Sequence, residues 1–254
     1  MRVFAVSDIH VDYDVNARWV QSLSLADYRD DVLILAGDVS DSAEVLAFTV
    51  QSLARRFKKL LFVPGNHDLW VLRHQQSLDS LEKFELVRRL VNEAGGLMTP
   101  WSCDEVAIVP LFAWYDFSFG QPGLALRESW VDFRACRWPA GFTEAEVTRH
   151  FLALNQSSLS VRHDKVITFS HFLPRIDVMP HYIPEPFRAL YPVLGSSALD
   201  GQVRALNPLM HVYGHSHVNR SVVMDGLRYV NNAFGYPGET RIAGKRLQCI
   251  FEPF

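Results

Sequence analysis

Short apolar runs that end abruptly in polar side chains constrain the fold of this chain more than any other feature of its sequence. Each run is rich in β-branched residues and too short for a typical helix, as expected for a strand buried on both faces. The runs lie at residues 2–7, 31–37, 59–65, 105–112, 165–170 and 210–214. Helical patterns separate several of them, at residues 41–57, 77–96 and 143–161. Strands that alternate with helices predict an α/β fold with a mostly parallel sheet.

The ends of two helical patterns carry recognisable signals. Asp41 followed by Glu44 is a capping-box arrangement at the start of 41–57. The pair Gly95 and Gly96 suits the C-terminal end of 77–96, because glycine readily adopts the left-handed conformation that closes many helices. Both signals predict where a helix meets its neighbouring loop.

The C-terminal third of the chain has a different pattern. Residues 221–226, 227–232 and 246–251 read as strands, and Asp225-Gly226 is a hairpin signal. The sequence contains no repeat of fixed period and no convincing linker, so we predict one domain over residues 1–254. We also predict loop insertions at about 112–142 and 172–195, where aromatic or proline residues are dense. Such loops either close over a site or cover the edge of the sheet.

Composition excludes several classes of function. The net charge is −3 and the pI is near 6.4, so no broad basic face marks a nucleic-acid polymer as the partner. The first apolar run is too short for a secretory signal peptide, and no later run is long and uncharged enough to span a membrane. The scattered cysteines Cys103, Cys136 and Cys249 fit a reducing compartment. We expect a cytoplasmic protein without a membrane partner.

Residues that bind metals or transfer protons follow five of the predicted strands. They are Asp8, His10, Asp38, Asn66, His67, Asp68, His171, His215 and His217. Because the carboxyl ends of parallel strands meet at one edge of a sheet, these side chains are expected to converge there. Carboxylate, amide and imidazole groups suit Mn²⁺, Fe²⁺ or Zn²⁺, whereas Ca²⁺ and Mg²⁺ prefer oxygen ligands. Each residue alone has an ordinary structural explanation, and only the whole set indicates a metal site.

Five motifs carry these residues in order, namely SDIH (7–10), GD (37–38), GNHD (65–68), SH (170–171) and GHSH (214–217). As a set, the motifs resemble those of the calcineurin-like metallophosphoesterases, with no departure at a metal-site position. The resemblance spans residues 7–217 and implies a single-domain, four-layer α/β/β/α sandwich with helices outside two facing sheets. The strand pattern by itself predicts one parallel sheet followed by hairpins, so the second sheet is implied by the resemblance.

The resemblance also implies two divalent transition-metal ions, of Mn, Fe or Zn. One ion is expected to be held by Asp8, His10, Asp38 and His217. The other is expected to be held by Asp38, Asn66, His171 and His215. Asp38 would bridge the two ions, since one carboxylate has two oxygens.

The catalytic group that the resemblance implies is His67, which would contact the phosphoryl group and protonate the leaving oxygen. Asp68 would accept the other ring N–H of His67, fix its tautomer and hold the ring cationic. Asp12 is either another acceptor of this kind or, as we favour, a solvated turn residue.

The implied reaction is hydrolysis of a phosphoester bond, and we expect a small-molecule phosphodiesterase. Protein Ser/Thr phosphatases of the family carry Arg-Gly before the Asn-His pair and a glutamate after it, whereas this chain has Pro64-Gly65 and Asp68. The alternatives are a phosphomonoesterase with the same metals, a nuclease, and a metal-binding scaffold without catalysis. The expected partner is a small phosphorylated substrate, with nucleotides among the candidates, and the oligomeric state stays open.

Three further residues are weaker candidates for substrate binding. Arg175 follows His171 by four residues and would clamp a phosphate oxygen, unless it is simply solvated. Asn231 and Asn232 occupy a position where the family often has an Asn-rich loop near the metals. The aromatic residues of the first insertion either stack on a substrate ring or, as we favour, pack beneath the loop; they are Trp114, Tyr115, Phe117 and Phe119.

Overall fold

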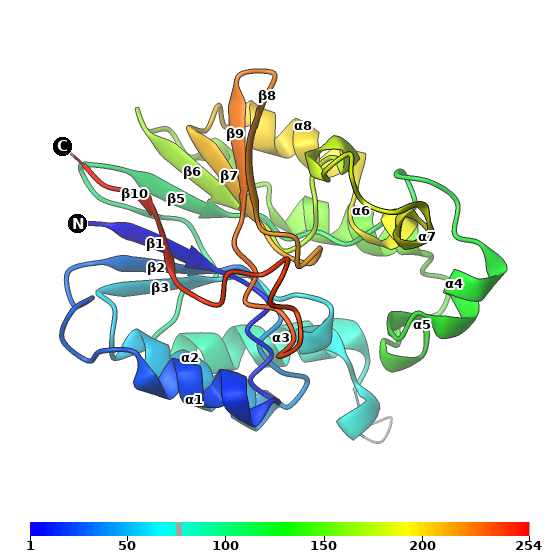
Figure 1. Cartoon of the computed structure of the whole chain (residues 1–254), viewed down its shortest axis with the longest axis horizontal. Helices are drawn as coiled ribbons and strands as arrows, with labels where there is room; N and C mark the ends of the chain where they lie inside the picture. Colours follow the sequence, from blue (N-terminus) through cyan, green and yellow to red (C-terminus); the bar gives the residue numbers. More distant parts are fainter. Residues whose placement is uncertain (75–77, 254) are drawn as a thin grey trace.

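Two β-sheets face each other, with helices on their outer sides (Figure 1). The computed structural model describes residues 1–74 and 78–253. One sheet has the strand order β10-β1-β2-β3, with bounds Gln248–Phe251, Val3–Val6, Val32–Leu35 and Lys59–Phe62. The other has the order β4-β5-β6-β7-β9-β8, with bounds Trp101–Ser102, Ala107–Pro110, Val166–Phe169, Met210–Tyr213, Leu227–Asn231 and Arg220–Met224. These sheets confirm the implied four-layer sandwich, and the prediction of one sheet from the strand pattern is wrong.

Parallel pairing runs through the middle of both sheets. β1, β2 and β3 pair in parallel, and so do β5, β6, β7 and β9. Antiparallel partners flank them, with β10 on β1, β4 on β5 and β8 on β9. The hairpin of β8 and β9 turns at Asp225 and Gly226, where φ is 50° and 80°, which confirms the hairpin signal. The carboxyl ends of the parallel strands point toward the same end of the sandwich (Figure 1).

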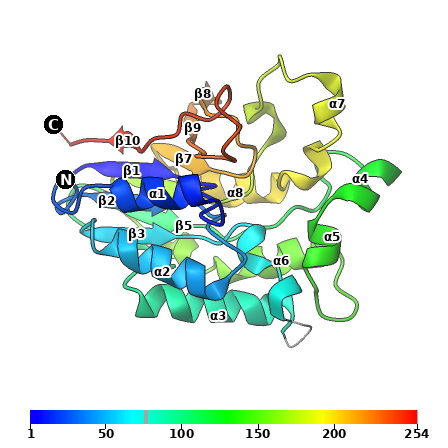
Figure 2. The same ribbon diagram turned by 60° about the horizontal axis from the view of Figure 1, so that its bottom comes forward.

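The longer helices form the two outer layers (Figures 1 and 2). Those outside the four-stranded sheet are α1 Asp14–Ser22, α2 Ala43–Ala54 and α3 Ser80–Glu93. Those outside the six-stranded sheet are α6 Glu144–Leu154 and α8 Ser197–Ala205. Short helices occupy the irregular connections, namely α4 Leu124–Ser129, α5 Asp132–Ala135 and α7 Glu185–Arg188. Single 3-10 turns lie at His67–Leu69, Leu72–His74, Ser158–Ser160, Ile176–Val178 and Tyr191–Val193.

Strand residues alternate between two hydrophobic cores, because successive side chains point to opposite faces of a sheet. In β1, Ala5 faces the core between the sheets, whereas Phe4 faces the core beneath the helices. In β2, Ile34 and Leu35 divide in the same way. Both faces of these strands are therefore apolar, which explains why their sequences lack the alternation of a half-exposed strand.

The start of α2 corrects one predicted helix end. The helix begins after Ser42, whose hydroxyl accepts the backbone N–H of Val45. The capping box predicted from Asp41 and Glu44 is therefore wrong, because the serine one residue later caps the helix. Asp41 instead accepts a hydrogen bond from the Arg73 guanidinium at 2.8 Å.

The other helices differ from the predictions mainly at their ends. Residue 77, where the second helix was predicted to start, lies outside the described residues, and Asp79 forms a capping box with α3. Gly95 has a φ of 89° just past α3, which confirms the predicted glycine stop. The helix predicted over 143–161 ends at Leu154, because Asn155 caps it and hydrogen-bonds to the backbone of Phe112. The sequence pattern does not predict α1 or α8.

Within residues 1–74 and 78–253, no helix combines the length and the apolar composition that crossing a bilayer requires.

We predict that Ile34→Ala lowers the free energy of unfolding by about 2–5 kcal/mol. Ile34 is fully buried between the sheets, so the shorter side chain leaves a cavity there. Urea denaturation of both proteins measures the difference. Val223→Ala is the control, because Val223 is 67% exposed on β8 and its truncation should change stability by only about 0.5 kcal/mol. Equal losses in the two variants would contradict the assignment of Ile34 to a packed core.

Candidate active site

The polar residues predicted at the strand ends converge in the structure. They lie in the loops after β1, β2, β3, β6 and β7, as Asp8, His10, Asp38, Asn66, His67, Asp68, His171, His215 and His217. All except His67 are at most 8% exposed. Buried charge of this density is costly unless opposite charge compensates it.

Backbone strain is concentrated in these loops. Five of the residues have a left-handed φ between 37° and 64°, namely Asp8, His10, Asp38, His215 and His217. Residues other than glycine adopt this conformation at a cost of roughly 1–2 kcal/mol each. Strain of this kind persists where the surrounding structure imposes it, and it gathers at functional sites. The positions of these five side chains are therefore set by the loops.

One group of side chains surrounds a space beside Asp8. The potential ligand atoms of Asp8, His10, Asp38 and His217 all lie within 4.8 Å of one another. Nε2 of His217 lies 3.2 Å from Nε2 of His10 and 3.2 Å from Oδ1 of Asp8. These four residues are the set predicted for the first metal ion.

A second group shares Asp38 with the first. Asp38, His171 and His215 also present atoms within 4.8 Å of one another. Nε2 of His171 lies 3.5 Å from Oδ2 of Asp38 and 3.2 Å from Oδ1 of Asn66. The structure thus brings together the set predicted for the second ion, with Asp38 between the two groups.

Backbone carbonyls determine the tautomers of two of these histidines. Nδ1 of His171 lies 2.8 Å from the oxygen of Ala36, and Nε2 of His215 lies 3.0 Å from the oxygen of Val193. A carbonyl oxygen can only accept, so both of these nitrogens carry protons. The other nitrogens, 3.1 Å apart, then direct their lone pairs at each other. Neutral rings in this arrangement need a cation between them, and imidazole, amide and carboxylate donors suit a divalent transition metal.

The pKa values of Asp38 and His217 also indicate that a cation belongs in this space. Burial, together with the charges of Asp8 and Asp68, raises the pKa of Asp38 well above its usual value. Burial lowers the pKa of His217, but the charges of Asp8 and Glu239 outweigh it and raise that pKa to about 10. Both shifts mean that positive charge is favoured in the space between these residues.

Asp68 has a different task from the one predicted. Its carboxylate accepts four backbone N–H groups, those of Asp38, Val39, Ser40 and Gly65, at 2.9–3.1 Å. The prediction that Asp68 bonds to the His67 ring is wrong, because both its oxygens are committed to these amides. Asp68 therefore joins the loop after β2 to the loop after β3 and positions Asp38.

His67 lies at the edge of the cluster, with its side chain 17% exposed. Its ring stacks on Trp70 with centroids 3.7 Å apart, and its backbone N–H donates to Oδ1 of Asp38 at 3.0 Å. Burial and the neighbouring His10 lower the pKa of His67 well below its usual value. This direction favours a neutral ring, and the cationic ring of the catalytic state stays a prediction.

Arg175 lies outside the cluster. Its guanidinium donates to Asp177 at 2.6 and 2.7 Å and to Asp225 at 2.7 Å. These bonds hold the proline-rich connection to the β8–β9 hairpin. The predicted phosphate clamp is wrong in this structure, because the donors that would bind phosphate already bind carboxylates.

Asn231, the last residue of β9, and Asn232 support the backbone and do not line the cavity described below. Asn231 donates to the carbonyl of Gly214 at 3.0 Å, and Asn232 donates to the carbonyl of Ala5 at 2.9 Å. Both are nearly fully buried, so their predicted role in binding substrate is wrong. Asn231 instead positions the loop that carries His215.

The structure agrees with the favoured interpretations of the aromatic residues Trp114 and Tyr115 and of Asp12. Trp114 and Tyr115 are at most 1% exposed and pack in the core, as expected for aromatic residues beneath a loop. Asp12 accepts a hydrogen bond from the Ser40 hydroxyl at 2.7 Å, and its side chain is 31% exposed, as expected for a partly solvated turn residue.

Three residues that the sequence patterns do not indicate complete the site. Asp132 is buried and accepts a hydrogen bond from Nδ2 of Asn66 at 2.9 Å, which turns Oδ1 of Asn66 toward His171. Glu239 accepts from Nδ1 of His217 at 2.6 Å, and the hydroxyl of Tyr236 lies 3.3 Å from Nε2 of His67. In the sequence, these three residues are marked only by their position in polar or aromatic stretches without a regular pattern. That signal is too weak to assign a role to any of them.

A cavity of about 200 Å³ opens beside the cluster. Polar groups of the site line it, among them Asp38, His67 and His217, together with Tyr236 and Glu239. Its lining also includes the apolar side chains of Trp130, Leu190 and Leu194. The cavity thus combines clustered metal-binding groups with an apolar surface.

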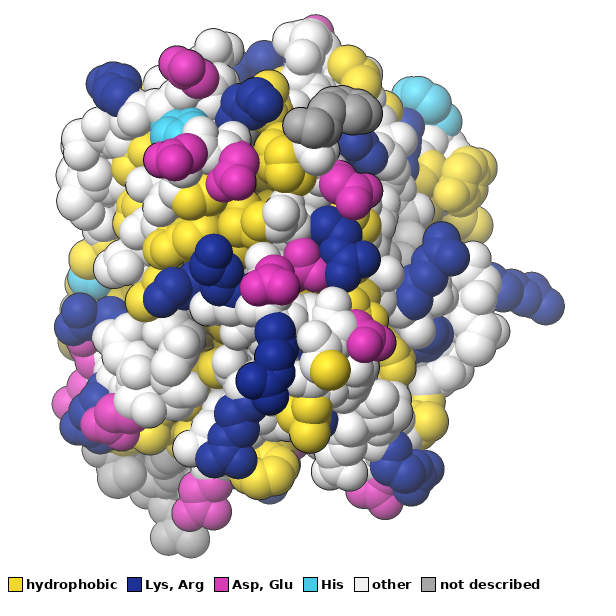
Figure 3. Space-filling model, turned by 90° about the vertical axis from the view of Figure 1, so that its left-hand side faces the viewer, with side chains coloured by type: hydrophobic (Ala, Val, Ile, Leu, Met, Phe, Trp, Pro, Cys, Tyr) yellow, Lys and Arg dark blue, Asp and Glu magenta, His cyan; other side chains and the backbone are white. Residues whose placement is uncertain are grey.

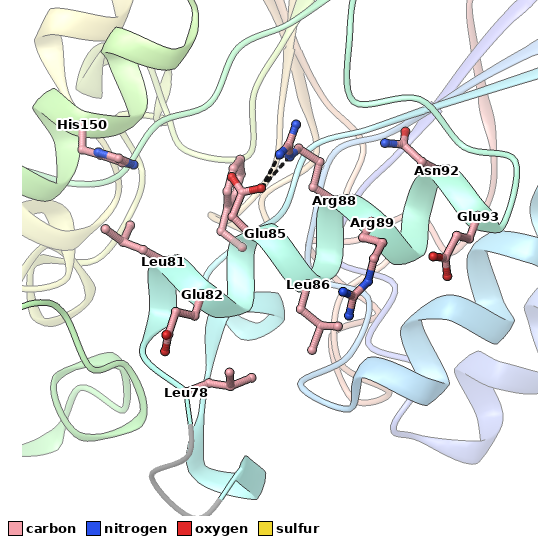
Figure 4. Close-up of a pocket in the computed structure, with 11 residues that line it drawn as sticks. Leu78, Leu81, Glu82, Glu85, Leu86, Arg88, Arg89, Asn92, Glu93 and His150 are labelled. Carbon is pink, nitrogen blue, oxygen red and sulfur yellow. Dashed lines mark hydrogen bonds and ion pairs between the residues drawn. The ribbon is translucent and has the colours of Figure 1, made fainter.

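A larger groove of about 990 Å³ lies along α3, away from this cluster (Figure 4). Its lining mixes apolar residues such as Leu81 and Leu86 with charges of both signs, and Glu85 pairs with Arg88 there. Neither metal-binding group lies in this groove. The candidate site is therefore identified by the metal-binding side chains around the smaller cavity, and not by the volume of the cavity.

The two-sheet fold and the paired carboxylate–imidazole groups define a hydrolase of phosphoester bonds. The model of the calcineurin-like phosphoesterases matches residues 1–219. The chain belongs to the calcineurin-like phosphoesterase family.

The chain is also similar to a curated protein and to a solved structure. The acyl-carrier-protein phosphodiesterase PptH of Mycobacterium tuberculosis (strain ATCC 25618 / H37Rv) is 29% identical over 266 residues, which cover 94% of this chain and 79% of the relative. The crystal structure of the phosphopantetheinyl hydrolase PptH from Mycobacterium tuberculosis superimposes with a TM-score of 0.82 and 24% identity, over 100% of this chain and 98% of that chain. This likeness confirms the fold across the whole chain.

We predict that Asp132→Ala weakens the affinity for Mn²⁺ by roughly 10–100-fold, because Asn66 loses the partner that orients its oxygen. Calorimetric titration of the metal-stripped protein measures this affinity. Asp132→Asn is the matched control, since its remaining oxygen can still accept from Asn66, and its affinity should stay closer to that of the wild type. Unchanged binding in a folded Asp132→Ala protein would contradict the orienting role.

Proposed function

We propose that this protein is a phosphodiesterase that uses two divalent ions, of Mn, Fe or Zn. The observation that carries the proposal is the position of Asp38, which belongs to both groups of potential metal ligands. Ions bound there would lower the pKa of water and offset the charge of a phosphoryl group. The unpaired cysteines Cys103, Cys136 and Cys249 support a cytoplasmic setting for this activity.

The chain's own residues would position and protonate the substrate. Asp38 would hold both ions, and Asp68 fixes the loop of Asp38 through backbone amides. His67 lines the cavity and supplies an N–H to the leaving oxygen. To act as an acid, the ring has to take up a proton when the phosphodiester binds, because burial and His10 lower its pKa in the resting protein.

For the substrate, we propose a phosphodiester with an aliphatic arm, of which the phosphopantetheinyl group on an acyl carrier protein is the leading candidate. Trp130, Leu190 and Leu194 offer an apolar surface next to the metal-binding groups, which suits such an arm. The 29%-identical relative is an acyl-carrier-protein phosphodiesterase. The alternative substrate is a small nucleotide diester, whose base would have to lie against the apolar surface of Trp130, Leu190 and Leu194.

A nucleic-acid polymer is a weaker candidate because binding one needs a continuous basic surface. The net charge of the chain is −3. On the end of the sandwich opposite the carboxyl ends of the parallel strands, Lys and Arg side chains are interspersed with Asp and Glu (Figure 3). A scaffold without catalysis is also weaker, because every expected metal ligand and His67 are retained.

We predict that the Mn²⁺-loaded protein hydrolyses bis-p-nitrophenyl phosphate faster than p-nitrophenyl phosphate. Asp38→Asn should lose this activity, because the neutral amide cannot bridge two cations as a carboxylate does. The rate of p-nitrophenol release and the metal content per chain are measured together. Preference for the monoester would make a phosphomonoesterase the better assignment, and bound metal without turnover of either ester would favour the scaffold.

We further predict that His67→Ala keeps its metals but loses roughly 10²–10⁴-fold in rate with poor leaving groups, which need a proton from the enzyme. The comparison uses a series of aryl phosphodiesters whose phenols differ in pKa. His163→Ala is the control, because His163 bonds to the backbone of Cys103 and Lys165 away from the site. An equal loss for good and poor leaving groups would contradict the acid role.

A further inference from the structure

The segment between β9 and β10 closes one side of the candidate site. Figure 1 shows it beside the loop that follows β1. The backbone N–H groups of Phe234 and Gly235 donate to the carbonyls of Ser7 and Asp8, each at 2.8 Å. The match to the family model ends at residue 219, so this segment lies beyond the part that the model describes.

Lys245 holds the segment in a tight loop. Its ammonium donates to three successive backbone carbonyls, those of Phe234, Gly235 and Tyr236. Asn16 donates to the carbonyl of Gly235 as well, at 3.1 Å. The carbonyls of the loop are therefore held by the side chains of Lys245 and Asn16, which lie outside the metal-binding groups.

Tyr236 is the residue that this loop places in the cavity. Its ring stacks on His10, with centroids 4.5 Å apart and an interplanar angle of 27°. Its hydroxyl lies 3.3 Å from Nε2 of His67, and both side chains line the cavity of about 200 Å³. Its backbone N–H donates to Oε2 of Glu239 at 2.7 Å, the oxygen that also accepts from His217.

We propose that Tyr236 is a further catalytic residue, whose hydroxyl donates a hydrogen bond to a phosphoryl oxygen of the substrate next to His67. The inference rests on the proposed phosphodiesterase function. The hydroxyl reaches the cavity at the same point as the His67 ring, so a phosphodiester that contacts His67 also meets Tyr236. The stacked ring of Tyr236 sets the direction of its hydroxyl, and a neutral donor adds no charge beside His10.

Tyr236→Phe separates this role from simple packing, because the ring and its contact with His10 are kept. We expect kcat/KM for bis-p-nitrophenyl phosphate to fall roughly ten- to a hundredfold, as for a lost hydrogen bond to a charged group. Binding of inorganic phosphate to the Mn²⁺-loaded protein, measured by calorimetry, should weaken roughly tenfold or more for the same reason. The metal content should not change.

Tyr13→Phe is the matched control. The Tyr13 ring lies edge-on to that of Tyr236 at 5.8 Å and is 46% exposed, so the same loss of a hydroxyl should leave both measurements unchanged. Wild-type kinetics and phosphate affinity in Tyr236→Phe would overturn the proposal. Phosphate binding that depends on Tyr236, without turnover of any ester by the wild type, would overturn the phosphodiesterase function and leave the contact of Tyr236 with phosphate standing.

Lys245→Met tests whether Lys245 positions the Tyr236 side chain in the cavity. If Lys245 acts by positioning Tyr236, then removal of the Tyr236 hydroxyl should matter less when Lys245 is absent. The two losses in kcat/KM would then combine to less than their product in the double variant. Fully multiplicative losses, in proteins with equal metal content, would overturn the positioning role of Lys245.

Discussion

The site depends on the mutual repulsion of buried acceptors. Oδ2 of Asp38 and the lone pairs of His171 and His215 point into one space, and Ala36 and Val193 hold the protons of both rings on their far sides. Such an arrangement is unfavourable unless positive charge occupies the space. A divalent cation bound there would satisfy all of these groups together, and its binding would then be coupled to the stability of this edge of the sandwich.

The loops keep these groups in place through backbone interactions. Asp68 joins the turns after β2 and β3 with four amide hydrogen bonds. A Cβ on Gly65 would lie 2.1 Å from Oδ1 of Asp38, which explains why only glycine fits there. Five ligand-bearing residues adopt left-handed backbone conformations. The two sheets bring the strand ends together, and these contacts resist relaxation of the strained loops.

The candidate metal ligands could be predicted because each follows a buried strand, and the ends of parallel strands meet at one edge. The partners of other polar residues could not, because these depend on loop geometry. Asp68 follows His67 directly in sequence, yet its oxygens face the amides of the β2 loop. The second sheet could not be predicted from the strand pattern either. β6 is as apolar as β2, and an apolar strand sequence does not specify which sheet the strand joins.

The orienting residues come from different parts of the chain than the ligands. Asp132 belongs to the aromatic connection before α6, and Glu239 belongs to the segment after β9. Each makes one hydrogen bond that turns a potential ligand, Asn66 or His217, toward the site. The same two connections also bring Trp130 and Tyr236 to the cavity wall. A change in either connection would therefore alter the candidate metal site and the cavity together, because one short segment supplies both the orienting carboxylate and a side chain that lines the cavity.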